Sequence, residues 1–173
     1  MSEIDEAWAL ALAEAERRAR ASGHGDIAEY LALRASNDLI RSTGIEWLVS
    51  TITLLAGEAN RRGASVSIEK EDAHRFSVGS AIMVGPRVTF RSGVRRLTIE
   101  AGWPRTPSDG IVRGSGLACA RIGHFGKHSE DNELLLICSS TGAPEWLILE
   151  KSGARIALLE AGLRKHLSRF LAD

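Results

Sequence analysis

The hydrophobic period of this chain changes at Gly63. Before that residue, apolar side chains recur every three or four positions, as Ile45 and Leu48 do; after it, Val66 and Ile68 alternate with polar neighbours. The first period is typical of an amphipathic helix and the second of a strand with one buried face. Helices first, then a run of strands and one closing helix, indicate an α+β fold with an antiparallel sheet.

Three helices are expected within residues 1–63. Trp8 begins the apolar stripe of the first helix, and Ser22-Gly23-His24-Gly25 interrupts it. Asp26 can cap the second helix. Thr43-Gly44-Ile45-Glu46 matches a capping box, so we expect a third helix to begin there and to end at Gly63.

The rest of the chain is expected to form a sheet and a final helix. Ser92-Gly93 predicts a two-residue hairpin turn, and the two prolines between Gly102 and Gly110 predict a long loop. We expect a single domain with a helical part (1–63), an antiparallel sheet of five to seven strands (64–151) and a C-terminal helix packed on the sheet (154–172). This order resembles helix-grip folds, in which a curved sheet wraps a long C-terminal helix. Beyond the alternation at Val66–Glu69, the expected strands are 74–84, 87–91, 94–101, 111–123, 132–138 and 145–151.

Positive charge is concentrated in the middle of the chain. Residues 75–127 hold nine bases and two acids, a net charge of +7, although the whole chain has 22 of each. Eight of the nine bases are arginine, whose planar guanidinium group suits carboxylates and phosphates. A basic segment within a neutral protein needs an anionic partner, either inside the molecule or outside it.

The predicted hairpin places arginines on one face of the sheet. With Ser92-Gly93 as the turn, Arg91 faces Val94, Thr89 faces Arg96, and Arg87 faces Thr98; Phe90 points to the other face. This face is either an anion-binding surface or a solvated face, or it is covered by the acidic helices. Nucleic acid is one candidate ligand, but only 5% of the residues are aromatic, so stacking partners for bases are few.

Two further features of the sequence, a Trp–Arg pair in the long loop and a face of small residues on an expected strand, can each be interpreted either as a ligand site or as part of the core. Trp103 and Arg105 lie in the long loop, where they could clamp a planar or anionic ligand through cation–π contact or close one end of the core. On the expected strand 111–123, one face carries small residues, which permit close approach of the C-terminal helix or form the floor of a pocket. These residues are Val112, Gly114, Gly116, Ala118 and Ala120.

No motif predicts a metal, a cofactor or a catalytic residue. If the strands pair so that opposite residue numbers sum to 257, Cys119 lies opposite Cys138. Two cysteines and two histidines could formally bind zinc, but the histidines are several residues away at the turn. Both thiols are therefore interpreted as small core residues. His74 is interpreted as an isolated surface or turn residue. Neither a nucleophile elbow nor a phosphate-binding loop is present in the sequence.

The resulting functional hypothesis is a soluble cytoplasmic binding module rather than an enzyme. Its ligand is a phosphorylated small molecule, nucleic acid or an acidic protein surface, with no membrane partner, because no secretory signal and no stretch of ~20 apolar residues is seen. One alternative is a small-molecule carrier or enzyme with an apolar cavity between sheet and C-terminal helix. Another is a homo-oligomer joined through the basic sheet and the acidic helices. The predicted ligand-binding residues are Arg87, Arg91, Arg96, Trp103 and Arg105.

Overall fold

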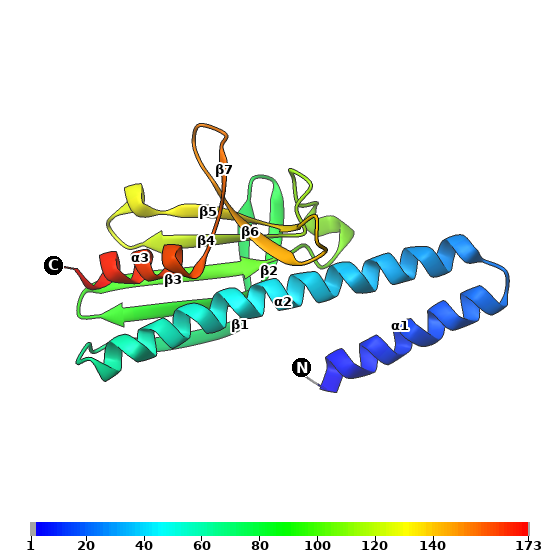
Figure 1. Ribbon diagram of the computed structural model, residues 1–173, viewed down its shortest axis with the longest axis horizontal. Helices are drawn as coiled ribbons and strands as arrows, with labels where there is room; N and C mark the ends of the chain where they lie inside the picture. Colours follow the sequence, from blue (N-terminus) through cyan, green and yellow to red (C-terminus); the bar gives the residue numbers. More distant parts are fainter. Residues whose placement is uncertain (1–2, 173) are drawn as a thin grey trace. The chain divides into compact units, whose positions relative to one another are not determined.

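The α+β fold with an antiparallel sheet is confirmed. A computed structural model describes the backbone of residues 3–172 and the side chains of residues 10–172, so the predicted role of Trp8 lies outside the described side chains. The described residues form three helices and one seven-stranded sheet whose strands are neighbours in chain order (Figure 1). The elements are α1 (Glu3–Ala21), α2 (Gly25–Arg61), β1 (Ser67–Val78), β2 (Ala81–Ser92), β3 (Arg95–Gly102), β4 (Ala118–His124), β5 (Asn132–Cys138), β6 (Pro144–Leu149), β7 (Arg155–Ala157) and α3 (Glu160–Leu171), with short 3-10 turns at Pro107–Asp109 and His128–Glu130.

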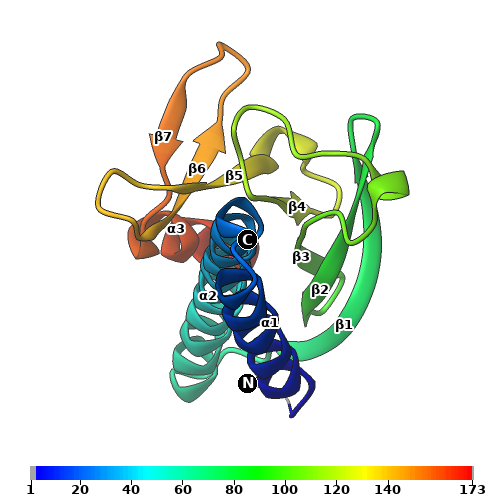
Figure 2. The same cartoon turned by 90° about the vertical axis from the view of Figure 1, so that its right-hand side faces the viewer.

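The chain divides into two compact units. The first, Met1–Ile40, consists of α1 and the beginning of α2; the second, Arg41–Asp173, contains the rest of α2, the whole sheet and α3. In the second unit the sheet curves around residues 41–61 of α2 and around α3 (Figure 2). The long helix that this curved sheet surrounds precedes the sheet in the chain, whereas the resemblance to helix-grip folds implied a long helix after it.

The prediction that a separate third helix begins at Thr43-Gly44-Ile45-Glu46 is wrong, because α2 runs without interruption through Gly44. A glycine inside a helix costs about 1 kcal/mol relative to alanine. Here it allows close packing, since a Cβ atom on Gly44 would lie 2.6 Å from Leu136 Cδ1. The indole Nε1 of Trp146 also donates a hydrogen bond to the Gly44 carbonyl, at 2.8 Å. Gly44 is therefore a contact point between α2 and the sheet, not the beginning of a helix.

Several strand boundaries also differ from the prediction, because glycines with positive φ form turns. Gly79 (φ 59°) divides the expected strand 74–84 between β1 and β2. Gly114 (φ 72°) and Ser115 (φ 61°) exclude an extended strand from 111, so β4 begins only at Ala118. Gly153 (φ 86°) ends the β6–β7 turn, and the last helix consequently begins at Glu160 instead of 154.

The late start of β4 corrects two predicted contacts. Gly116 approaches Leu135 of β5, not the C-terminal helix, since a Cβ atom there would lie 2.2 Å from Leu135 Cδ1. Cys119 lies opposite Leu135 and not opposite Cys138, which pairs with Pro144. Cys119 is buried, as expected, and burial raises the pKa of its thiol to about 11; Cys138 is exposed and is therefore not a core residue.

The sheet has apolar residues on both faces. One face buries Val88, Phe90, Leu97 and Ile99, in the alternation expected for β2 and β3. The opposite face carries a smaller cluster that the loop residue Val112 helps to cover. The smaller cluster consists of Phe76, Ala81, Met83, Cys119 and Leu135. Beside it, the same face of the sheet becomes polar.

α2 qualifies, by length and composition alone, as a helix that could cross a membrane; it is the one such helix among the described residues. The expectation that no stretch approaches a membrane span is therefore wrong by this measure. In the second unit, however, Leu48, Ile52, Leu55 and Ala56 of α2 are buried within the protein. A core helix of a folded protein has the same composition, so the apolar character of residues 41–61 is accounted for by packing.

Candidate functional site

The polar face of the sheet brings together three of the five predicted ligand-binding residues. β2 contributes Arg87, Thr89 and Arg91, and β3 contributes Arg96, Thr98 and Glu100. The turn residues are Gly93 and Val94, one position later than predicted, so Arg91 lies opposite Arg96 and Arg87 lies opposite Glu100. A shift of two residues in the pairing leaves each side chain on its predicted face, because side chains alternate with a period of two. We call these six residues the polar face.

Two arginines of the polar face have carboxylate partners on β1. Arg87 Nη2 lies 2.8 Å from Glu71 Oε2, and Arg91 Nε lies 3.6 Å from Glu69 Oε1. All four side chains are about half exposed to solvent, so each pair contributes at most about 1 kcal/mol. The neutralising acids come from the neighbouring strand rather than from the acidic helices, which the sequence analysis had considered. A signal was present, since Glu69 and Glu71 alternate with Ile68.

The structure also assembles a hydrogen-bonded triad that sequence reasoning missed. His74 Nε2 lies 2.9 Å from Glu100 Oε2, and Arg121 Nη1 donates to Glu100 Oε1 at 3.0 Å. Glu100 is only 14% exposed. His74 directly follows an irregularity in the β1–β2 register, and such bulges re-aim side chains. The interpretation of His74 as an isolated residue is therefore wrong. Both carboxylate oxygens of Glu100 are engaged, which favours a structural role.

Arg91, Arg96 and Phe125 form what we call the basic–aromatic patch. Among the described residues Arg96 makes no ion pair; its guanidinium carbon instead lies 4.6 Å from the centre of the Phe125 ring. The Phe125 amide donates to the Arg96 carbonyl at 2.9 Å, so the two residues are held side by side. Phe125 is 63% exposed. Like charges directly opposite each other in a sheet repel, so Arg91 and Arg96 favour an anion between them.

The other two predicted residues, Trp103 and Arg105, are in contact with each other. The guanidinium carbon of Arg105 lies 3.5 Å from the centre of the Trp103 ring, and that of Arg41 lies 5.9 Å from it. Arg41 Nε also donates to the Leu117 carbonyl at 2.8 Å. The indole ring of Trp103 thus makes its cation–π contacts within the protein, and a planar ligand would have to compete with these arginines for it.

Asp109 holds the loop that carries this Trp–Arg contact. The buried carboxylate accepts hydrogen bonds from Arg75 Nη2 at 2.7 Å and from the amides of Thr106 and Arg105 at 3.1 and 3.2 Å. Burial by itself raises the pKa of Asp109, but the hydrogen bonds from Arg75, Thr106 and Arg105 outweigh it and leave the pKa below its ordinary value. The loop is thus fixed by a charged residue, and Arg105 is presented from a defined backbone.

A groove of about 340 Å³ lies between α2 and α3. Leu55, Ala59 and Leu167 supply apolar lining, and Arg164 at its border is paired with Glu58 at 3.3 Å. The carrier hypothesis placed an apolar cavity between the sheet and the C-terminal helix instead. The buried residues of α3 are Leu163, His166, Leu167 and Phe170.

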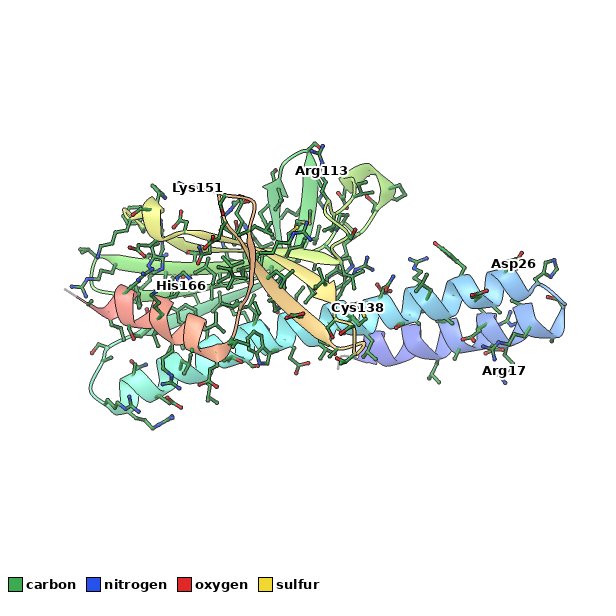
Figure 3. The ribbon with its side chains drawn as sticks, turned by 45° about the horizontal axis from the view of Figure 1, so that its top comes forward. Arg17, Asp26, Arg113, Cys138, Lys151 and His166 are labelled. Atoms are coloured by element: carbon green, nitrogen blue, oxygen red, sulfur yellow. The ribbon has the colours of Figure 1, made fainter. Side chains whose placement is uncertain are left out.

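His166 belongs to a buried hydrogen-bonded chain between α3 and the sheet (Figure 3). Its Nδ1 lies 2.9 Å from His124 Nε2, and its Nε2 lies 2.9 Å from Asn132 Oδ1. Nε2 of His166 therefore donates to Asn132, and its Nδ1 accepts from His124, which requires the His166 ring to be neutral. Burial lowers the pKa of His124. Burial also lowers the pKa of His166, and with the added effect of the nearby His124 this pKa falls to about 4.

Comparisons with the models of known protein families, with curated proteins and with solved structures find no match to this chain. Function must therefore be inferred from the chemistry of the residues described above.

Proposed function

We propose that this protein is a binding module for an anionic ligand or partner, with the basic–aromatic patch at the centre of the contact. The observation that carries the proposal is the pairing of Arg91 with Arg96 across β2 and β3, next to an exposed aromatic ring. Guanidinium groups donate to carboxylates and phosphates with matching geometry, and an adjoining ring adds apolar contact area. Phosphorylated small molecules, nucleic acid and acidic protein surfaces all present such groups.

The five predicted residues contribute unequally to this proposal. Arg96 has no acidic partner among the described residues, and Arg91 has a loose one at 3.6 Å, so both keep donors for a ligand. Arg87 is engaged with Glu71 at 2.8 Å and contributes less. Trp103 and Arg105 supply a second, preorganised contact from the loop that Asp109 holds.

Binding rather than catalysis is proposed because the His74–Glu100 pair beside this face is already engaged by Arg121. Glu100 interacts with His74 and Arg121 through both oxygens. A general base needs a free lone pair directed toward the substrate. We further propose that the protein acts in the cytoplasm, which agrees with Cys119 and Cys138 both being free thiols.

Salt-dependent retention on heparin, a phosphate-like polyanion, tests the patch. The variant Arg91→Ala/Arg96→Ala is expected to elute at lower salt than the parent protein, because the salt dependence falls by about one counterion for each lost contact. Arg87→Ala should lower the salt concentration of elution by less than Arg91→Ala alone or Arg96→Ala alone. The matched control, Arg62→Ala/Lys151→Ala, removes the same charge from exposed positions elsewhere. Equal elution of control and patch variant would contradict the proposal.

A further inference from the structure

The first unit carries an acidic surface with apolar residues beside it. Asp26, Glu29, Tyr30 and Leu33 occupy positions i, i+3, i+4 and i+7 of α2, so they share one helical face. All four are exposed, Tyr30 by 62% and Leu33 by 60%. Among the described residues neither Asp26 nor Glu29 forms an ion pair. Figure 3 marks Asp26 at the beginning of α2. We call these four residues the acidic–apolar patch.

A two-helix unit leaves such residues uncovered. Helices are stabilised chiefly by burying an apolar face against a neighbouring layer. In the described part of the first unit, only Ala19, Ala28 and Ile40 are apolar and buried. Tyr30 and Leu33 thus remain available to a partner.

The charges of the two units have opposite sign. Residues 1–40 hold eight acids and four bases, a net charge of −4, whereas residues 41–173 hold fourteen acids and eighteen bases, a net charge of +4. Two acidic first units from different copies would repel each other. The favourable contact between copies therefore joins the first unit of one with the second unit of the other.

The acidic–apolar patch and the basic–aromatic patch match in chemistry and in spacing. Each presents two like charges, Asp26 and Glu29 in one and Arg91 and Arg96 in the other. Residues three apart on a helix have Cβ atoms about 5–6 Å apart. Residues directly opposite in an antiparallel sheet have Cβ atoms about 4.5–5.5 Å apart. Two carboxylates can therefore meet two guanidinium groups without rearrangement of either backbone.

Apolar groups accompany the charges on both surfaces. Phe125, and also Val94 in the β2–β3 turn at 93% exposure, are available to meet Tyr30 and Leu33. Apolar contact excludes water, and charge pairs are stronger where water is excluded. An exposed ion pair alone would contribute little. The combination accounts for both the charges and the uncovered apolar side chains.

We propose that the acidic–apolar patch of one copy of this protein binds the basic–aromatic patch of a second copy. This inference rests on the proposed function and names the anionic partner. Each copy carries both surfaces, so one copy can bind another through either surface.

Analytical ultracentrifugation of the full chain at low and high salt tests the inference. We expect concentration-dependent association at low salt, weakened by rising salt. Asp26→Lys/Glu29→Lys and Arg91→Glu/Arg96→Glu should each be monomeric under conditions where the parent protein associates. An equimolar mixture of these two variants should associate again, because each mixed contact then joins opposite charges. Glu133→Lys, an exposed reversal elsewhere, is the control and should associate like the parent. Circular dichroism verifies that each variant is folded.

Heparin retention of the same variants separates the failure of this inference from that of the proposed function. Association together with retention supports both. A monomeric parent protein that is retained on heparin overturns the second-copy inference and leaves the binding proposal standing, whereas a monomer without retention overturns both. Association that survives both charge reversals also overturns the inference, since other surfaces then hold the copies together. Saturable binding of an oligonucleotide or of anionic vesicles by a monomeric parent would assign a different partner and overturn it too.

Discussion

The polar face of β2–β3 and the His124–His166 contact between β4 and α3 use polar groups in opposite ways. On the polar face, Arg87 and Arg91 pair with Glu71 and Glu69 in water, where solvent can replace each partner. At the helix–sheet contact, His124 and His166 are both only 4% exposed, and solvent cannot replace either. Buried polar groups must be satisfied inside the protein, so the second region should matter for stability and the first for binding.

The largest effect is expected from His166→Ala. The change removes a buried ring and leaves His124 without its acceptor, so the free energy of unfolding should fall by about 3 kcal/mol. Denaturant unfolding measures this loss. Ser168→Ala, on the exposed side of α3, is the control and should change stability by less than about 1 kcal/mol. If both variants lose the same free energy of unfolding, buried and exposed polar groups do not differ in their contribution to stability.

The next effect should appear as a dependence of stability on pH. The pKa of His166 is about 4 in the folded protein and 6.5 in an exposed side chain. Below pH 6.5 the unfolded chain therefore binds more protons than the folded one, and the free energy of unfolding decreases until the pH reaches about 4. The total decrease is on the order of 3 kcal/mol. Unfolding measured between pH 7 and pH 4 should show this decrease, and in His166→Gln the slope should be smaller. An unchanged slope in that variant would assign the acid sensitivity to other groups.

The smallest effect is expected on the polar face. A double-mutant cycle with Arg87→Ala and Glu71→Ala should give a coupling energy of about 0.2–1 kcal/mol, because both side chains are about half exposed to solvent. High salt should reduce it further. Denaturant unfolding of the four proteins in the cycle measures it. A coupling of 2 kcal/mol or more would mean that this pair is shielded from water, which would remove Arg87 and Glu71 from the solvated surface.

The chain order of the elements and the faces of β2 and β3 were predictable because they depend on local periodicity. A period of 3.6 or 2 selects helix or strand. An error of one position in the turn shifted the pairing by two residues and so left Arg87, Arg91 and Arg96 on the same face. Even the neutralising acids were readable in principle, since Glu69 and Glu71 alternate with Ile68 on β1.

Local rules failed where a distant contact decides the conformation. The sequence around Gly44 matched the pattern of a helix N-terminus, but Gly44 lies inside α2, where it contacts Leu136 and Trp146 of the sheet. Its neighbours along the chain carry no information about side chains that lie about ninety to a hundred positions later. His124 and His166 likewise appeared unrelated, because their hydrogen bond spans 42 positions.

The sequence by itself therefore determined the α+β class, the helix–strand order and the concentration of arginine in the middle of the chain, since composition and period are properties of the chain alone. Only the tertiary structure decided which arginines have acidic partners, that Arg96 lies beside Phe125, and that His74, Glu100 and Arg121 meet. Hydrogen bonds and ion pairs act over a few ångströms, and which residues come that close is set by strand register and helix packing.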